Sequence, residues 1–570
     1  MSASVTLAAC YKPDGNFTLA ALLDRIVADD GLSRQKRQDV ASALRGLAKV
    51  LRLPAASISA APSHLRLEIN KLTPAMAGLS PGRWRNIRTL TQFALAHVGL
   101  AKVPGRYRSA PSAAWSVLVN RLVYGDRYRL GHLARYCTVS GIEPGDIDDA
   151  VLGGFLMDLQ RFSLAAEPER MHREAIIVWN RAASTHPEWP QRTLLVPNNR
   201  PSYVLPWESF PSSLKEDVDS WLDRLAGTDP FDDYDFKPLR AASLVTRKKQ
   251  IHEYLSALVI EGVEQSDLRV LADAVTPDRA KKGLNFFWKR AGNKPSLHGC
   301  QIAGVVKALA RHRAKLLPAD LDRLKTISRR ITPDSFGMTE RNKTRLRPLD
   351  DRQQVRDLLT LPTCIRAEVV GAGTPTHSLA VRLQAAVMVE LLLMVPIRLR
   401  NLSSLTIGKH LLFGRGGEVT LAIPGHEVKN GMSIEAHLPG ETADLLDLYI
   451  AKYRPLIDPG STWLFPGRTA DAPKSDDGLR QQLKTCLRER CGLDFTPHTF
   501  RHATGKILLD QNPGAHGQVQ QILGHKRIAT TIAFYTGLEG KNAIAHWDKL
   551  VTEMRNTDAT MPSRALRRKV

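Results

Sequence analysis

The chain has 570 residues, which excludes a single hydrophobic core and predicts three or four domains. Lys and Arg outnumber Asp and Glu by 80 to 57, a formal net charge of +23. This excess predicts a polyanionic partner, and nucleic acid is favoured over an anionic membrane surface.

Neither secretion nor insertion into a membrane is expected. The N-terminus, MSASVTLAACYKPDG, has no basic start followed by an apolar core, so no signal peptide is predicted. The longest apolar stretch, Leu379 to Ile397, is interrupted by Arg382, Gln384 and Glu390. A membrane span needs about 20 nearly uninterrupted apolar residues. The stretch therefore predicts a buried helix.

The six cysteines show no CxxC pair and no grouping with histidines that would suggest a metal site. They stand at positions 10, 137, 300, 364, 486 and 491. This usage is typical of a protein kept in a reducing compartment. We therefore expect a cytoplasmic location, no disulfide framework and no zinc site.

Helical patterns separated by polar breaks run along most of the chain. In FPSSLKEDVDSWLDRL, apolar residues from Leu214 to Leu225 recur at helical spacing. Ser213, with Glu216 three residues later, predicts a capping box at the start of this helix.

One segment of the chain is echoed in another. GIEPGDIDDA (141–150) resembles GVEQSDLRVL (262–271), with Gly, Glu and Asp in matching places. Each segment follows a helix rich in aromatic and aliphatic residues, and each precedes another apolar helix. We interpret them as two copies of one small helical module, with a fainter third copy in residues 17 to 105. The alternative is chance similarity between two helix-turn-helix stretches.

Composition suggests the domain boundaries. Three polar, Pro-rich or basic stretches are expected to be linkers: 186–207, 227–238 and 331–348. The expected domains are an N-terminal helical region (1–108), a helical module with a Pro-rich linker (109–236), a second helical domain (237–336) and a C-terminal domain (337–570).

A small β structure is expected in the C-terminal domain. EVTLAI (418–423) predicts a strand, and HEVKNGMSIEAHLP (426–439) predicts a hairpin in which Asn430 and Gly431 form a type I′ turn. Lys429 comes immediately before that turn, where a solvated lysine is the ordinary interpretation. The expected fold class is therefore mainly α, multi-domain, with a small hairpin or sheet in the last domain.

Two stretches of the C-terminal domain place basic residues beside helix ends. MVPIRLRNLSSL puts Arg398 just after the long apolar helix, where a cation also suits a helix C-terminus. TPHTFRHATGKILLD predicts a new helix with Thr496 as its cap and Pro497 at its first position. His498 and Arg501 then lie one turn apart on one face. A helix N-terminus with an added Arg and His suits an oxyanion or phosphate, although HxxR is also an ordinary surface pair.

The last unusual stretch, LGHKRIATTIAFYTG, contains His525 and Tyr535. Packing is the ordinary role of a tyrosine. The stretches together, however, supply two arginines, one lysine, two histidines and one tyrosine, with no clustered carboxylates for Mg²⁺. This set suits phosphoryl transfer in which cationic donors neutralise the charge that develops on phosphate oxygens. A tyrosine with a pKa near 10 needs a base to take its proton. We hypothesise that Tyr535 attacks a phosphodiester.

The order Arg, Lys, HxxR, His, Tyr resembles the tyrosine recombinase (phage integrase) family. The resemblance rests on PIRLRNLSSL, VKNG, HTFRH, LGH and TTIAFY and covers about residues 338 to 552. It implies a phosphate held by arginines and histidines, a hairpin lysine that protonates the departing 5′ oxygen, and a 3′-phosphotyrosyl intermediate. The implied site residues are Arg398 and Arg501 (phosphate clamp), His498 (proton acceptor and phosphate ligand), His525 (phosphate ligand), Lys429 (general acid), Tyr535 (nucleophile) and His502 (support from behind).

The sequence departs from the family pattern in two places. The family usually has Glu or Asp three residues after the first arginine, and here that position is Asn401. Tyr535 also lies one residue further beyond His525 than in the commonest members. Of the other tyrosines, Tyr449 and Tyr453 precede the HxxR box and are expected to be packing residues.

The resemblance also implies a small helical core-binding domain before the catalytic domain, so that the two clamp DNA. Residues 239 to about 330 suit that role, because LRAASLVTRKKQIHEYLSAL offers a basic helix for phosphate contacts. Residues 1 to 235 exceed the usual architecture. Binding of DNA arms and binding of protein partners are both open for them.

The function that we expect is a site-specific DNA recombinase or integrase encoded by a mobile element, which needs no cofactor, neither ATP nor a metal. Its expected partners are double-stranded DNA carrying recombination sites, further copies of itself in a synaptic homotetramer, and accessory recombinases or directionality factors. The alternatives are a type IB topoisomerase-like enzyme that relaxes DNA and a DNA-binding protein that has lost catalysis. The segment LEGKNAIAHWDKLVTEM after the tyrosine favours recombination, because recombinases exchange such a tail between subunits.

Overall fold

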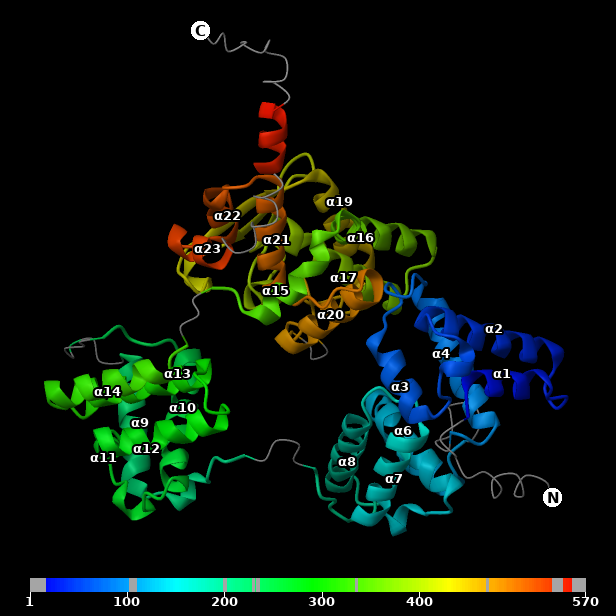
Figure 1. The fold of residues 1–570 in the computed structure, drawn as a ribbon, viewed down its shortest axis with the longest axis horizontal. Helices are drawn as coiled ribbons and strands as arrows, with labels where there is room; N and C mark the ends of the chain where they lie inside the picture. Colours follow the sequence, from blue (N-terminus) through cyan, green and yellow to red (C-terminus); the bar gives the residue numbers. More distant parts are fainter. Residues whose placement is uncertain are drawn as a thin grey trace, which may run out of the picture. The chain divides into compact units, whose positions relative to one another are not determined.

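The computed structural model describes residues 17–101, 110–197, 202–227, 231, 236–333, 337–467, 471–535 and 547–555. Residues 1–16, with Cys10, and residues 536–546 after the tyrosine lie outside the described residues. The chain divides into two compact units, Met1–Pro197 with Gly337–Val570, and Asn198–Phe336. The described residues are mainly helical with a small antiparallel sheet, which confirms the predicted fold class (Figure 1).

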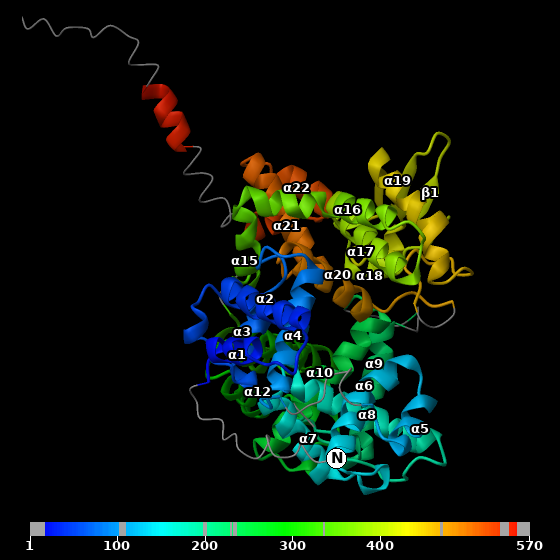
Figure 2. The same ribbon diagram turned by 90° about the vertical axis from the view of Figure 1, so that its right-hand side faces the viewer.

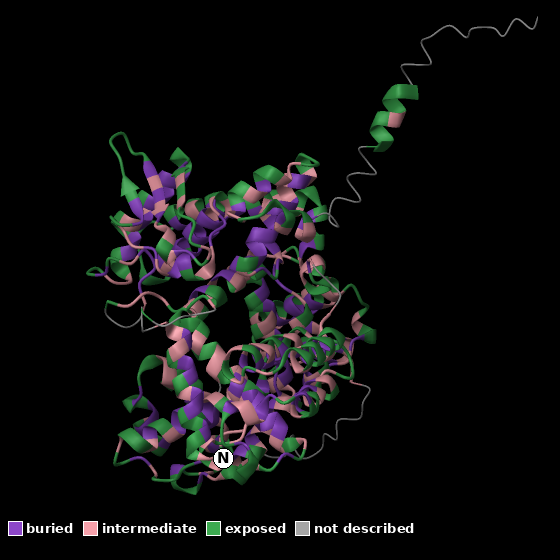
Figure 3. Cartoon of the chain, turned by 90° about the vertical axis from the view of Figure 1, so that its left-hand side faces the viewer, coloured by how far each residue is buried: buried purple, intermediate pink, exposed green. Residues whose placement is uncertain are grey.

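Eight α-helices make up the described part of Met1–Pro197. They are α1 Leu19–Val27, α2 Arg34–Leu51, α3 Pro62–Lys71, α4 Pro81–His97, α5 Ala113–Arg121, α6 Tyr124–Val139, α7 Asp149–Phe162 and α8 Pro168–Thr185. Two hydrophobic clusters hold them, one among α1 to α4 and one around Trp115, Trp179 and Trp189. Buried, intermediate and exposed residues alternate along the helices of the chain in Figure 3.

The unit Asn198–Phe336 has its own hydrophobic core. Its helices are α9 Ser212–Ala226, α10 Ala241–Ile260, α11 Leu271–Ala274, α12 Pro277–Arg290, α13 Leu297–Ala308 and α14 Pro318–Ile331. The predicted boundary at residue 236 is wrong, because Leu214, Val218 and Trp221 of α9 are buried in the same cluster as α10 and α12.

The predicted capping box at the start of α9 is also wrong. The helix begins at Ser212, and its N-cap residue is Pro211, which makes no side-chain capping bond. The Ser213 hydroxyl instead donates to the Arg269 carbonyl at 2.9 Å. A tertiary contact has therefore replaced the local one.

The two echoed segments adopt the same local structure. Gly141 and Gly262 both have a positive φ, at 67° and 82°, and each ends a long helix. A 3₁₀ turn follows in both, at Pro144–Asp146 and Gln265–Asp267. The segments then differ, because α7 follows directly in the first, whereas the four-residue α11 precedes α12 in the second. The origin of the two segments as copies of one module stays a prediction.

The part Gly337–Val570 contains the sheet and a helical core. Its helices are α15 Glu340–Leu346, α16 Arg352–Gly371, α17 His377–Met394, α18 Leu399–Ser403, α19 Gly440–Leu448, α20 Asp476–Cys491, α21 Pro497–Gln511, α22 His516–Leu523 and α23 Ile528–Tyr535. The strands β1 Leu411–Phe413, β2 Val419–Ile423 and β3 Ile434–Leu438 form an antiparallel sheet in the order β1-β2-β3. A further helical segment covers residues 547–555.

Helix α17 is the central helix of this part. It packs against α16, α20 and α21 (Figure 2). Among the described residues, it alone is long and apolar enough to cross a membrane, with a mean hydropathy of 1.4, but 56% of it is buried inside the structure. Its buried residues belong to the hydrophobic cluster that also contains Phe500 and Tyr535. The predicted buried helix is confirmed.

Candidate active site

Arg398 follows the end of α17 and begins α18. Its backbone is extended, with φ −74° and ψ 151°, and it is the N-cap residue of the helix. The side chain is half-buried, and burial lowers the pKa of its guanidinium. Within the described residues it forms no ion pair with a carboxylate. The end of α17 thus places Arg398, a partly desolvated cation without a carboxylate partner among the described residues, at the surface of the domain.

Helix α21 begins as the sequence predicts. The Thr496 hydroxyl accepts a hydrogen bond from the Thr499 backbone N–H, the Thr499 hydroxyl accepts one from the Thr496 N–H, and Pro497 occupies the first helical position. The first turn presents His498 as an exposed side chain, whereas Arg501, one turn later, is only 6% exposed.

The Arg501 guanidinium connects two loops of the site. Its Nη1 donates to the Pro396 carbonyl at 2.5 Å, and its Nη2 donates to the Leu523 carbonyl. Pro396 lies two residues before Arg398, and Leu523 lies two residues before His525. Burial, together with the neighbouring Arg398, lowers the pKa of Arg501 to about 10. Three separate stretches of sequence are therefore joined by one buried cation.

His525 is held by the end of α22 and by α23. Gly524 ends α22 with a φ of 59°, a conformation that suits glycine, and the His525 N–H then donates to the Gln520 carbonyl at 3.0 Å. The imidazole Nδ1 lies 2.9 Å from the hydroxyl of Thr531, which is fully buried on α23. Burial and the charges of Arg501 and Arg398 lower the pKa of His525.

Tyr535 ends α23 and is only 1% exposed. Its hydroxyl donates to the Arg501 carbonyl at 3.1 Å, and it lies 3.3 Å from Nδ1 of His502. A Cβ at Gly505 would stand 2.6 Å from the tyrosine ring, so the ring rests directly on the backbone of α21. Burial raises the pKa of Tyr535. In this position the hydroxyl is beside the site residues of α21 but is sheltered from solvent.

His502 lies behind the exposed face of the site. It is 5% exposed, and its ring contacts His498, with 4.8 Å between ring centroids. Burial, followed by the charges of His498 and Arg501, lowers the pKa of His502 to about 4. This imidazole is therefore neutral near pH 7.

Lys429 is exposed in the connection between β2 and β3. The predicted type I′ turn is wrong. The Gly431 N–H donates to the Val428 carbonyl at 3.0 Å, so the central turn residues are Lys429 and Asn430, and neither of these described residues has a positive φ. A type I′ turn requires a positive φ at both central positions. The strands pair only up to Ile423 and Ile434, which leaves a ten-residue connection.

Asn401 stands where the family usually has a carboxylate, but it makes a contact that a carboxylate could not make. It is 3% exposed, and its Nδ2 donates to the Glu427 carbonyl at 3.1 Å. A carboxylate at this position would be an acceptor only and could not make this bond. Asn401 therefore connects the helix after Arg398 with the β2–β3 connection.

The two other tyrosines of the domain are packing residues, as predicted. Tyr449 is fully buried, and its hydroxyl donates to the Leu464 carbonyl at 3.1 Å. Tyr453 is 3% exposed, and its hydroxyl donates to the Val369 carbonyl at 3.4 Å. Neither hydroxyl lies against the cations of the site.

The electrostatics of the site are those of an uncompensated cluster of cations. Burial and the charges of Arg501, Arg398 and Lys429, in that order, lower the pKa of His498. The protonated forms of these groups thus disfavour one another. Within the described residues no carboxylate pairs with them, and no group of His, Cys, Asp or Glu side chains is arranged to hold a metal ion. The arrangement can bind an anion such as a phosphodiester between Arg398, Arg501 and the histidines.

Sequence reasoning missed the residues that hold the site in place. Gly505 had a visible signal, because a glycine inside a helix usually has a packing reason. Glu427 and His410, which support the Lys429 connection, had none, because their contacts join segments that are distant along the chain.

Comparison with known proteins places part of the chain beside one family. Residues 372–541 match the model of the phage integrase family. This stretch of the chain is therefore similar in sequence to the phage integrase family. No match to a curated protein sequence was found.

Solved structures of recombinases also match the chain. A crystal structure of the XerA recombinase is 15% identical over 58% of this chain and 98% of its own, with a TM-score of 0.24. A pre-cleavage complex of the XerH site-specific recombinase bound to difH substrate is 14% identical over 60% and 97%, with a TM-score of 0.35. At these scores the likeness does not bear on the site.

Proposed function

We propose that this protein is a site-specific DNA recombinase that cuts and rejoins strands through a 3′-phosphotyrosyl intermediate. The observation that carries the proposal is the cluster of Arg398, Arg501, His498 and His525, free of carboxylate partners among the described residues, beside the buried Tyr535. A cluster of cations that disfavour one another's charge is stabilised by a bound anion. The net charge of +23 supports DNA as the source of that anion.

In the proposed reaction, Arg398 and Arg501 bind the non-bridging oxygens of the scissile phosphate and stabilise the charge that builds up on them. The Tyr535 oxygen attacks phosphorus, and its proton passes to His498. The bond from phosphorus to the 5′ oxygen breaks, and Lys429 gives that oxygen a proton. Rejoining is the reverse sequence with a new 5′ hydroxyl. Before the attack, the Tyr535 hydroxyl must leave its contacts with Arg501 and His502. Its burial there raises its pKa and makes it a weak nucleophile.

The helical segment 547–555 supports action as an assembly of several copies. Trp547 is 65% exposed, Leu550 is 39% exposed and Met554 is 63% exposed, and their spacing places them on one face of the helix. An apolar face of this kind suits exchange of the tail between subunits in a synaptic tetramer. A mobile-element origin and a cytoplasmic location remain part of the proposal.

Trapping of the covalent intermediate tests the proposal. On a nicked suicide DNA that carries the right site, the wild-type protein should accumulate a covalent protein–DNA adduct. Tyr535→Phe should bind the DNA equally well and form none. Tyr453→Phe is the matched control, because it removes a buried tyrosine hydroxyl of the same domain and should still form the adduct.

Three outcomes would contradict the proposal. An adduct on a different tyrosine would remove Tyr535 from its role. Failure of the wild-type protein to form any adduct on DNA that it binds specifically would favour a binding protein without catalysis. Relaxation of supercoiled plasmid without exchange between two sites would favour the topoisomerase alternative.

A further inference from the structure

The turn that carries Lys429 is anchored on both sides. Val428, just before the lysine, is 1% exposed and lies in the hydrophobic core. Asn430, just after it, donates from Nδ2 to the Gly524 carbonyl at 2.7 Å, in the loop that leads to His525. A Cβ at Gly425 would stand 2.6 Å from the Gly431 carbonyl oxygen, so the start and end of the connection are in close contact. Lys429 is therefore an exposed residue on a fixed turn.

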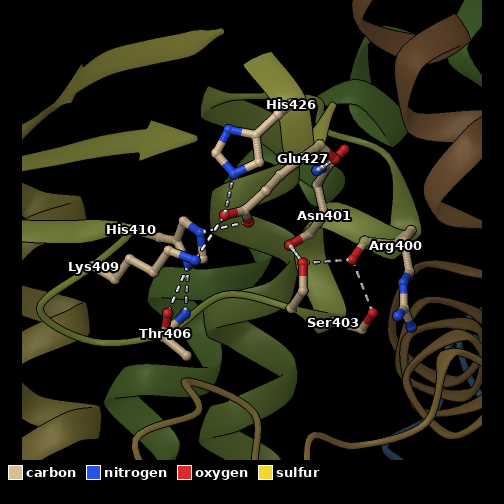
Figure 4. A network of polar contacts seen from close by, with 9 residues as sticks. Arg400, Asn401, Ser403, Thr406, Lys409, His410, His426 and Glu427 are labelled. Atoms are coloured by element: carbon tan, nitrogen blue, oxygen red, sulfur yellow. Dashed lines mark hydrogen bonds and ion pairs between the residues drawn. The ribbon is translucent and has the colours of Figure 1, made fainter. Parts of the chain in front are cut away.

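Glu427 supplies most of the polar contacts at the start of this turn (Figure 4). Its Oε1 lies 2.7 Å from Nζ of Lys409, and its Oε2 lies 3.0 Å from Nε2 of His410. Nε2 of the exposed His426 lies 3.5 Å from Oε1. The backbone carbonyl of Glu427 accepts the bond from Asn401. Both carboxylate oxygens and the carbonyl are thus engaged, two residues before Lys429.

The tautomer of His410 follows from its partners. This histidine is 3% exposed, and its Nδ1 accepts a hydrogen bond from the Thr406 backbone N–H at 3.0 Å. An N–H group can only donate, so Nδ1 carries no proton and Nε2 does. His410 therefore donates from Nε2 to Glu427. A neutral amide at position 427 would present its own N–H₂ group to one of these two donors, so the site selects a carboxylate.

We infer that Glu427 is a positioning residue for the proposed strand cleavage. It fixes the turn through His410, Lys409 and Asn401, and so places the Lys429 ammonium where it can protonate the departing 5′ oxygen. Because the two carboxylate oxygens of Glu427 already contact Lys409 and His410, Glu427 does not form an ion pair with the Lys429 ammonium. The inference rests on the proposed function, and specifically on Lys429 as the general acid.

A substrate with sulfur in place of the 5′ bridging oxygen isolates this role. A thiolate leaves without a proton, so loss of the general acid slows cleavage of ordinary DNA and spares the sulfur substrate. With the full-length chain in single turnover, Lys429→Ala should be slower by roughly 10²–10⁴-fold on ordinary DNA, the usual contribution of a general acid. It should cleave the sulfur substrate at close to the wild-type rate. Arg501→Ala should be slow on both.

Glu427→Gln should show the same pattern of rates on the two substrates as Lys429→Ala. We expect a loss of roughly 10-fold or more on ordinary DNA, a part of the general-acid contribution, and recovery on the sulfur substrate. In the Lys429→Ala background it should cause no further loss. Glu418→Gln is the matched control, because it removes the same charge from an exposed position beside β2. If Glu427→Gln folds poorly, Lys409→Gln is the second variant, because it removes the ion pair to Glu427 from an exposed position. It should slow cleavage of ordinary DNA less than Glu427→Gln does, and its rate on the sulfur substrate should be close to that of the wild type.

The outcomes separate the inference from the function on which it rests. If Lys429→Ala is rescued by sulfur and Glu427→Gln is slow on both substrates, Glu427 acts on the fold or on phosphate binding, and the inference is overturned. A wild-type rate for Glu427→Gln on ordinary DNA overturns it as well. If the sulfur substrate fails to rescue Lys429→Ala itself, the general acid is another group, and the roles of both Lys429 and Glu427 are wrong. The role of Tyr535 is tested separately by trapping of the covalent adduct.

Discussion

At the scale of single residues, the chemistry depends on what surrounds the hydroxyl of Tyr535. That hydroxyl has one proton, and the Arg501 carbonyl accepts it in this structure. The neutral His502 is its other neighbour. Arg501 therefore contacts the site twice, because its guanidinium holds two loops and its carbonyl holds the Tyr535 hydroxyl. Movement of α21 would change both contacts together, which in the proposed mechanism would couple phosphate binding to release of the tyrosine.

His502 should make the stability of the protein depend on pH. Its pKa is lowered to about 4 in the folded chain, and an unfolded histidine titrates near 6.5. Between these values the unfolded chain binds the extra proton, so the free energy of unfolding is full above about pH 6.5 and falls as the pH drops towards about 4. His502→Gln should remove up to about 1.4 kcal/mol per pH unit from this dependence.

Urea unfolding of the full chain at several pH values in that window measures the effect. The exposed His437→Gln on β3 is the matched control and should keep the wild-type slope. Equal slopes for His502→Gln and the wild type would show that the imidazole is solvated in the folded protein.

The candidate site residues can be selected from the sequence because their order and local spacing are visible in it. HTFRH places His498 and Arg501 on one helix face without knowledge of the fold. The partners of Arg501 could not be predicted, because Pro396 lies 105 residues away in sequence and Leu523 lies 22 away. Nothing local marks a backbone carbonyl as the acceptor of a buried guanidinium.

At the scale of elements, local signals succeeded where no tertiary contact competes with them. Thr496 caps α21 as predicted, because its hydroxyl has the Thr499 N–H within reach. Ser213 fails as a cap because the Arg269 carbonyl takes its hydroxyl. The Asn430–Gly431 pair, which favours a type I′ turn, fails for a related reason. The Asn430 side chain bonds to Gly524 and the connection is ten residues long, so strand pairing does not determine the turn.

Thr496 is expected to stabilise the helix that carries His498, Arg501 and His502. Thr496→Ala should lower the free energy of unfolding by about 1 kcal/mol, the usual cost of a lost N-cap. Thr496→Ser keeps a hydroxyl in the same place and should lose much less. Urea denaturation monitored by circular dichroism compares the two. An equal loss for both variants would mean that the methyl group, not the capping bond, carries the contribution of Thr496.

At the scale of the whole molecule, the chain has far more structure than the phage integrase domain at residues 372–541. Composition predicts a linker at 186–207, where the division at Asn198 falls, but it does not assign α9 to the following core, because only the buried face of that helix shows which core it joins. Residues 17–101, together with Leu164, form a further core around α2 and α4.

We propose that one face of α2 contacts DNA. Three of its exposed cations fall within about 60° of one another at 100° per residue: Arg34, Arg45 and Lys49. Their side chains pair with no carboxylate among the described residues. Asp39, the one acid of the helix, lies off this face and bonds to Gln35. The first turn of α2 also lacks acids, which leaves the positive end of the helix uncompensated. A row of cations along one helix face suits the phosphates of a nucleic acid backbone.

The final prediction therefore concerns the salt dependence of DNA binding. Replacing the three cations of this face with Gln should weaken binding to long DNA and reduce the slope of log K against log salt by up to roughly 2.7, at about 0.9 for each lost phosphate contact. Trapping on a short suicide DNA should be unchanged, because the candidate active site is intact. The matched control removes three exposed arginines that lie on three different helices, α1, α4 and α7: Arg25, Arg85 and Arg161. It lowers the net charge equally, so it should change the slope much less if contacts rather than overall charge determine binding. A slope that the α2 variant leaves unchanged would make this helix a surface for protein partners, the other role left open for residues 1 to 235.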